Sequence, residues 1–295
     1  MDKLIAFLNE RPFILGDGAM GTMLQAAGLT TGGAPEEWNV SRPDVVRGIY
    51  QAYVDAGSQV IETNSFGGTR YRLGRDNLQD RVRELNLAAA RLARAVADAA
   101  DHPVLVAGSV GPTGEILFPL GALTAEDARA AFAEQAAALA EGGVDFFLIE
   151  TMSALEEVQA AIEGIRSVTD LPIAVTMTFD TRGRTMMGVK PGQALQALYD
   201  WGIRVMGANC GNGPAETEQV IAQMAAVKPA DVYLIAQSNA GLPKYVDRKI
   251  HYDGTPEVMA AYALKMRELG VSYIGACCGS TPAHIRAMGE ALSGR

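Results

Sequence analysis

One pattern recurs four times along the 295-residue chain and limits the folds that are open to it. A helical segment ends at a glycine, and a run of apolar residues follows directly, in residues 55–64, 141–151, 200–210 and 268–278. Glycine ends helices because it adopts the left-handed conformation without a steric penalty. An unbroken apolar run is typical of a parallel strand that is buried on both faces. The pattern therefore predicts repeated units of a helix followed by a buried strand.

Four further apolar segments complete the set of predicted strands: residues 13–16, 104–108, 173–178 and 232–237. Ala-rich stretches with apolar residues at helical spacing lie between strands, for example residues 81–100 and 125–142. Eight alternating strands and helices in a chain of this length are typical of a (β/α)8 barrel. The sequence predicts an α/β fold, a TIM barrel that forms one domain over residues 1–295, with a helix over residues 2–10 that closes its bottom. A doubly wound open sheet is the alternative.

Charge and hydropathy narrow the functions that suit such a barrel. The formal net charge is −9 and the basic residues are scattered, which disfavours nucleic acid or an acidic membrane as a partner. No stretch approaches the roughly 20 apolar residues of a membrane span, and the N-terminal apolar run is too short for a signal peptide. We therefore expect a cytoplasmic protein that acts on a small molecule. In a reducing compartment its three cysteines are not expected to form structural disulfides.

Polar residues end most of the predicted strands, and in a barrel these ends meet at one mouth. In chain order they are Asp17, Glu62, Thr63, Asn64, Ser109, Glu150, Thr151, Asn209, Cys210, Ser238, Asn239, Cys277 and Cys278. All three cysteines of the chain are in this set. Cys210 and Cys277 lie two βα units apart, and alternate strands contribute to the same interior layer, so the two thiols are predicted to meet.

The adjacent cysteines Cys277 and Cys278 do not fit a regular strand, in which neighbouring side chains point to opposite faces. Because Gly275 and Gly279 flank them, the strict alternation need not extend to Cys278. Together with Cys210, they offer Zn²⁺ three soft ligands and an open fourth position, which is the catalytic arrangement of zinc. Buried, inert cysteines and a strained vicinal disulfide are the alternatives.

Five strings of the sequence carry a resemblance to a known family. They are ILGDGAMGTMLQ (residues 14–25), PEEWN (35–39), ETNSFGG (62–68), GANCG (207–211) and GACCGSTPAHIRAM (275–288). The chain resembles the zinc-dependent homocysteine S-methyltransferases over almost its whole length. The motif DGAMGTML is most similar to the corresponding sequence in the N-terminal homocysteine-binding modules of cobalamin-dependent methionine synthases.

The resemblance implies a zinc-dependent methyltransferase on a (β/α)8 barrel. Cys210, Cys277 and Cys278 then hold Zn²⁺, the sulfur of homocysteine takes the open position, and methyl transfer to that sulfur gives methionine. In some members of the family an oxygen at the position of Asn239 binds zinc when the substrate is absent.

The resemblance also implies residues that bind the amino-acid end of homocysteine. The ammonium group is expected on Asp17 and Glu150, and the carboxylate on the backbone N–H groups of Gly18, Ala19 and Met20. Purely structural roles are the alternatives, with Asp17 capping its turn and Glu150 forming an ion pair at the rim.

The methyl donor is the least constrained part of this hypothesis. No D-x-H-x-x-G corrinoid signature surrounds any of the three histidines, so a corrinoid is expected on a separate protein. The wording of the first motif favours this donor over free S-methylmethionine or a betaine. Two alternatives of other classes are a non-catalytic zinc-binding or redox-sensing barrel, and a metal-assisted lyase or hydrolase that uses the rim carboxylates.

Overall fold

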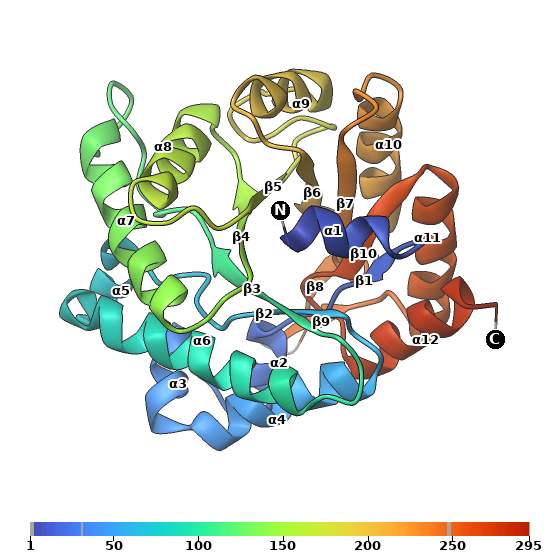
Figure 1. Cartoon of the computed structure of the whole chain (residues 1–295), viewed down its shortest axis with the longest axis horizontal. Coiled ribbons are helices and arrows are strands. Elements are labelled where there is room, and N and C mark those ends of the chain that lie inside the picture. The colour runs from blue at the N-terminus through green and yellow to red at the C-terminus, as the bar shows by residue number, and fades with distance from the viewer. Residues whose placement is uncertain (1–2, 31, 247–248, 295) are drawn as a thin grey trace.

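The computed structural model describes residues 3–30, 32–246 and 249–294, and the side chains of residues 245–250 lie outside this description. Eight parallel strands surround a central axis, and helices surround the strands (Figure 1). The strands are β1 (Ile14–Leu15), β2 (Val60–Glu62), β3 (Leu105–Val110), β4 (Phe146–Met152), β5 (Ile173–Met177), β6 (Val205–Cys210), β7 (Tyr233–Ser238) and β10 (Val271–Ala276). Their hydrogen-bonded order is β1-β10-β7-β6-β5-β4-β3-β2. The predicted (β/α)8 barrel is confirmed, and the open doubly wound sheet is excluded.

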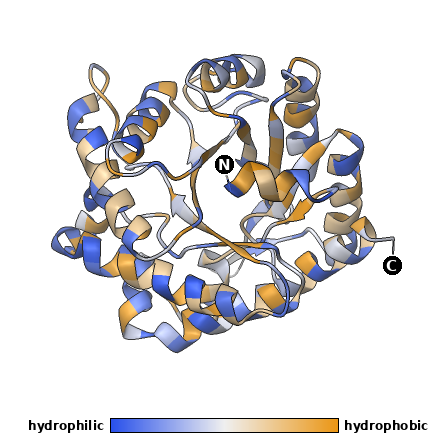
Figure 2. Cartoon of the chain, viewed as in Figure 1, coloured by the Kyte–Doolittle hydropathy of each residue, from blue (hydrophilic) through white to orange (hydrophobic). Residues whose placement is uncertain are grey.

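One helix precedes β1, and the others follow the strands and form the outer layer of the barrel. The helices are α1 (Lys3–Asn9), α2 (Gly21–Ala26), α3 (Trp38–Ser41), α4 (Pro43–Asp55), α5 (Arg70–Gly74), α6 (Val82–Ala99), α7 (Ala125–Glu141), α8 (Leu155–Arg166), α9 (Pro191–Asp200), α10 (Pro214–Ala225), α11 (Pro256–Glu268) and α12 (Pro282–Leu292), with 3-10 turns at Pro35–Glu37 and Gln79–Arg81. The outer helices alternate apolar and polar colours along their length (Figure 2), and their buried apolar residues pack on the outer faces of the strands. Across the described residues, no helix is both long and apolar enough to cross a membrane.

Hydrogen bonds join the segments of β1 and β2, the first and last strands of this order, and one of them runs from Ser58 Oγ to Gly16 O at 3.1 Å. Gln59 N donates to Leu15 O at 2.7 Å, and Leu15 N donates to the Gln59 side-chain oxygen at 3.1 Å. At the mouth, Glu62 N donates to Asp17 Oδ2 at 2.8 Å. The short β1 therefore meets β2 largely through side chains, and one of these side chains is the predicted site residue Asp17.

Helix α1 closes the bottom of the barrel, as the sequence predicts. Leu4, Phe7 and Leu8 pack against the inward-facing apolar residues of the strands, such as Ile14 and Phe146. Figure 1 shows α1 across the end of the barrel nearest the viewer. With the bottom filled, only the opposite end, where the strands finish, is left for a site.

Two segments outside the predicted strands and helices contain regular structure. The segment after β1 includes α2 and α3, and the segment after β7 forms an antiparallel hairpin of β8 (Pro243–Val246) and β9 (Lys249–Tyr252). Gly254 N donates to Ala240 O at 2.8 Å, which brings the two ends of the hairpin segment together. This hairpin lies beside the end of β10, because a Cβ on Gly279 would lie 2.1 Å from Tyr252 Cγ.

Candidate metal and substrate site

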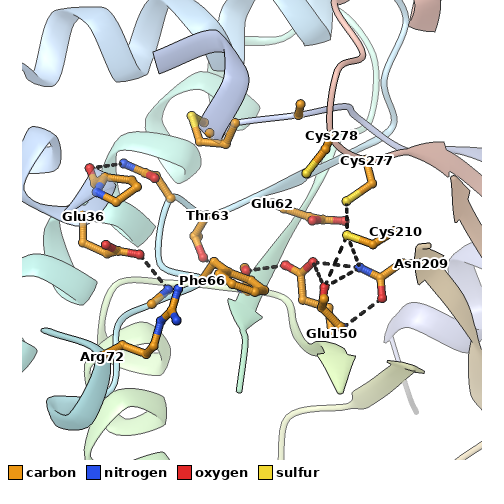
Figure 3. A pocket seen from close by; sticks show the side chains of 18 of the residues that line it. Glu36, Glu62, Thr63, Phe66, Arg72, Glu150, Asn209, Cys210, Cys277 and Cys278 are labelled. Atoms are coloured by element: carbon orange, nitrogen blue, oxygen red, sulfur yellow. Dashed lines mark hydrogen bonds between the residues drawn. The ribbon is translucent and has the colours of Figure 1, made fainter. Parts of the chain in front are cut away.

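A cavity of about 450 Å³ opens where the strands end at the mouth of the barrel. Its lining includes most of the predicted rim residues: Asp17, Glu62, Thr63, Asn64, Ser109, Glu150, Thr151, Asn209, Cys210, Cys277 and Cys278. Figure 3 shows the three cysteines converging on one side of this cavity, with Glu150 and Asn209 next to them. Cavities of this size hold small organic ligands. The mouth is therefore the candidate functional site.

The three cysteines form one cluster, in which all the Sγ atoms lie within 4.8 Å of one another. Cys210 and Cys277 are closest, at 2.7 Å between their sulfurs, which is well beyond a disulfide bond of roughly 2.05 Å. Strand β10 ends at Ala276, so Cys277 and Cys278 both follow the strand, and Gly279 turns the chain with a φ of 80°. The adjacent thiols face one point because the pleat ends before them.

This cluster fits a soft metal ion such as Zn²⁺. Thiolates are the preferred ligands of zinc, and three of them leave one tetrahedral position open. Hydrogen bonds from the Cys210 and Cys277 thiols hold the pKa of Cys278 well below its usual value, so negative charge already gathers on the cluster. Tetrahedral Zn–S bonds of about 2.3 Å separate the sulfurs by roughly 3.8 Å, so Cys210 and Cys277 have to move apart to bind the ion.

Asn239 lies beside the cluster but is not part of the cavity lining. Its side chain is buried, its Nδ2 donates to Gly211 O at 2.6 Å, and its Oδ1 has no hydrogen-bond partner among the described residues. A buried amide oxygen without a partner is costly. This oxygen is therefore available as a further ligand.

The backbone at the ends of β4 and β6 is strained next to the thiols. Thr151 and Cys210 have φ values of 60° and 58°, which non-glycine residues seldom adopt. Asn209 holds the two strand ends together, because its Oδ1 accepts from Thr151 N at 2.8 Å and its Nδ2 donates to Thr151 Oγ1 at 2.7 Å. Thr151 Oγ1 in turn lies 3.7 Å from Cys210 Sγ. This network fixes the direction in which Cys210 points.

Three buried carboxyl groups share the inner part of the cavity: Asp17, Glu62 and Glu150. These carboxyl groups accept hydrogen bonds from neutral donors: Glu150 Oε1 from Ser109 Oγ at 2.5 Å, Glu62 Oε1 from Gln237 Nε2 at 2.5 Å, and Asp17 Oδ2 from the Glu62 backbone N–H. The second oxygen of Asp17 has no partner in the described part of the chain.

Burial raises the pKa of all three carboxyl groups. The pKa of Glu150 rises to about 7, and the charge of Cys278 adds to the effect of burial there. The pKa values of Asp17 and Glu62 rise well above their usual range, because repulsion from neighbouring carboxylates adds to the effect of burial. Buried carboxylates without a cation are unfavourable, so a bound cation is expected to stabilise them. An ammonium group of a ligand fits this part of the cavity.

Residues Gly18, Ala19 and Met20 line the cavity beside Asp17. Ala19 N already donates to Ser280 Oγ at 3.0 Å, and Ala19 O accepts from Tyr53 OH at 2.7 Å. A Cβ at Gly18 would lie 2.4 Å from Ser280 Oγ, so this position has no room for a side chain. The sequence predicts that the backbone N–H groups of Gly18, Ala19 and Met20 bind the substrate carboxylate. Because the Ala19 N–H group already donates to Ser280, Gly18 and Met20 are the main candidates.

Several lining residues had no assigned role in the sequence analysis, among them Glu36, Phe66, Arg72, Arg75 and Gln237. Glu36 lies in the PEEWN string, which is the sequence signal that could have identified it. Gln237 precedes the predicted rim residues Ser238 and Asn239, and its role as the partner of Glu62 depends on a contact between distant strands. The two arginines lie outside the family strings, Arg72 in α5 and Arg75 directly after it.

The pH dependence of ligand binding tests the carboxyl groups. A protonated carboxyl group cannot pair with an ammonium ion, so the affinity for L-methionine should rise between pH 6 and pH 8, by up to about tenfold per pH unit for each proton released. The raised pKa values of Asp17 and Glu62 act in the same direction. Calorimetric titration measures it, and Glu150→Gln should flatten the rise near pH 7. An affinity that is constant over this range in the unmodified protein would contradict the assignment.

A parallel barrel with a thiol cluster and buried carboxyl groups at its mouth belongs to the class of barrel enzymes that bind a small ligand at the strand ends. Within this class, the chain belongs to the homocysteine S-methyltransferase family, whose model matches residues 14–292. The family resemblance seen in the sequence is therefore confirmed.

Individual relatives agree with this assignment. The chain is 36% identical over 305 aligned residues to methionine synthases of Mycobacterium tuberculosis and Mycobacterium leprae, an alignment that covers 98% of this chain and 25% of theirs. It therefore spans about a quarter of the length of these relatives. The fold matches the homocysteine methyltransferase MmuM of Escherichia coli in its metallated form, with a TM-score of 0.81, 22% identity, and coverage of 97% of this chain and 98% of that one.

Proposed function

We propose that this chain is a homocysteine S-methyltransferase that holds Zn²⁺ on Cys210, Cys277 and Cys278 and forms methionine. The observation that supports this most is the presence of two different sites in one cavity, a cluster of three thiols and a group of three buried carboxyl groups. The first suits a thiolate-binding metal and the second an ammonium ion. Homocysteine carries a thiol and an ammonium group on one short chain.

Zinc, when bound, supplies a Lewis acid that keeps the substrate sulfur deprotonated at neutral pH. The protein then positions the other end of the substrate. Asp17 and Glu150 receive the ammonium group, with Ser109 orienting Glu150, and the amides of Gly18 and Met20 receive the carboxylate. The sulfur attacks the methyl carbon of the donor, the bond from that carbon to its leaving group breaks, and the leaving group keeps the electron pair.

The carboxyl groups favour this function over the two other classes. A purely structural zinc site or a redox sensor does not require three buried carboxyl groups without a cationic partner beside the thiols. A hydrolase or lyase would use ionised carboxylates as bases, whereas burial raises the pKa of all three carboxyl groups here, and a bound ammonium group would favour the ionised form of the group that it contacts. We also propose that residues 1–295 act as one homocysteine-binding domain in the cytoplasm, with no nucleic acid or membrane partner.

We favour a methylcorrinoid on a separate protein as the methyl donor, with S-methylmethionine or a betaine as the alternative. The DGAMGTML motif, which resembles the homocysteine-binding modules of cobalamin-dependent methionine synthases, supports this choice. A panel of donors at equal concentration tests it, with zinc-loaded protein and homocysteine. We expect methylcobalamin, free or on a carrier protein, to give methionine at least about tenfold faster than S-methylmethionine or glycine betaine. A clear preference for either of these two would reassign the donor.

A further inference from the structure

The cavity continues beyond the cysteines into a second part, the outer lobe, formed by residues 32–36 and 66–76. In Figure 3, Glu36 and Arg72 lie on the side of the cavity away from the three cysteines, and Phe66 lies between. The proposed function uses only the inner part for homocysteine. The outer lobe therefore has lining residues with no role so far, including two arginines.

The outer lobe has a rigid wall. Asn39 Nδ2 donates to Asn64 O at 2.8 Å, and Asn64 Nδ2 donates back to Asn39 Oδ1 at 2.9 Å and to Pro35 O at 2.8 Å. These bonds fasten the PEEWN string to the end of β2. Glu36, which is only 4% exposed, accepts from Gly67 N at 2.6 Å. A buried carboxylate is thus fixed on the wall of the lobe.

Arg72 lies on the same wall of the outer lobe, and the N–H groups of its guanidinium group have no partner in the described part of the lobe. Within the described residues, its side chain forms no hydrogen bond or ion pair, and the charge of Glu36 is close enough to interact with it. Its neighbours differ: Arg75 donates to Gly114 O at 2.5 Å, and Arg70 pairs with Glu134 at 2.8 Å outside the cavity. A guanidinium group has five N–H donors in a fork that matches a carboxylate or a phosphate.

All cationic side chains of the described cavity lining lie in the outer lobe. Arg72 and Arg75 are found there together with Glu36 and Asp76, whereas the inner part contains thiols and three carboxyl groups and no cation. The uncommitted N–H groups of Arg72 therefore suit an anionic group of the methyl donor, and the inner part does not. The anionic group of the donor therefore points away from the homocysteine sulfur, and the remainder of the donor, with its methyl group, extends toward that sulfur.

Resting on the proposed function, we infer that Arg72 is a specificity-determining residue that binds an anionic group of the methyl donor. The group is a carboxylate or a phosphate. Glycine betaine and S-methylmethionine carry the first, and the nucleotide of methylcobalamin carries the second. Glu36 lies on the same wall, and its charge interacts with that of the guanidinium group.

Binding to zinc-loaded protein tests this inference, because binding is measurable whether or not methyl transfer is detected. Two pairs of ligands differ in the anionic group: glycine betaine with choline, and methylcobalamin with methylcobinamide, which lacks the nucleotide phosphate. In calorimetric titrations we expect the unmodified protein to bind at least one anionic member about 10- to 100-fold more tightly than its partner, the range for hydrogen bonds to a charged group. The pair that shows the difference identifies the source of the anion.

Arg72→Gln should abolish this difference, Arg72→Lys should retain part of it, and the matched control Arg70→Gln should leave it unchanged. L-Methionine affinity should stay within about twofold in all three variants, which also shows that they are folded. The inference is overturned if the unmodified protein does not distinguish the members of either pair, or if the difference persists in Arg72→Gln. Failure of methyl transfer with intact Arg72-dependent binding would instead count against the proposed function.

Discussion

Replacing Cys210 by serine is expected to abolish both stoichiometric zinc binding and methyl transfer to homocysteine. The hydroxyl group is a far weaker zinc ligand than a thiolate, and two thiols cannot replace a set of three. Loss of an outer-shell partner alone costs about 10- to 100-fold in metal affinity, so loss of a ligand should cost at least about 100-fold. Zinc content after gel filtration and methionine formation measure the two effects.

The fold should survive this change, because the buried cores of the barrel do not include the thiol cluster. We expect the melting temperature of Cys210→Ser to stay within a few degrees of that of the zinc-free parent. Ser238→Ala is a matched control, since Ser238 is the strand partner of Cys210 but offers no thiol. It should keep about one zinc per chain. Full zinc occupancy in Cys210→Ser would remove Cys210 from the ligand set.

Glu150→Gln is expected to weaken homocysteine binding by about 10- to 150-fold, which corresponds to about 1.5–3 kcal/mol for a hydrogen bond to a charged group. The substitution keeps the size of the side chain and removes the charge that faces the ammonium group. Zinc content should not change, because Glu150 is not in the thiol cluster. Calorimetric titration of zinc-loaded protein with L-homocysteine gives the affinity.

Glu157→Gln is the control for this experiment. Glu157 is a buried carboxyl group that accepts from Thr113 N at 2.8 Å and from Thr113 Oγ1 at 2.6 Å, and it does not line the cavity. A general effect of losing a buried carboxylate would appear in both variants. Equal homocysteine affinity in Glu150→Gln and the unmodified protein would exclude Glu150 from the substrate site.

The barrel was predictable because its signal is local and repeated. Each glycine before an apolar run marks the end of a helix and the start of a strand, as at Gly143 before β4 and Gly270 before β10. The hairpin of β8 and β9 was missed because both strands are short and lie in a segment with many polar residues. In the same way, α2 has only six residues and lies outside the predicted strands and helices.

The meeting of Cys210 with Cys277 followed from barrel symmetry, since strand ends converge whatever their separation in the sequence. Other contacts in the site depend on side-chain rotamers and on strained backbone angles, which the spacing of residues in the sequence does not indicate. The bridge from Asn209 to Thr151 requires a φ of 60° at a threonine, and the partner of Glu62 is Gln237, 175 residues away. Arg72 lies outside the five family strings, so its position in the cavity lining could be found only from the structure.

X-ray absorption at the zinc edge gives the most direct test of the proposed chemistry. Zinc-loaded protein should show three sulfur neighbours and one lighter ligand, for which Asn239 is the candidate. Addition of L-homocysteine should raise the count to four sulfurs with loss of the lighter ligand. An unchanged set of neighbours after addition of saturating homocysteine would contradict activation of the substrate sulfur at the cluster of Cys210, Cys277 and Cys278.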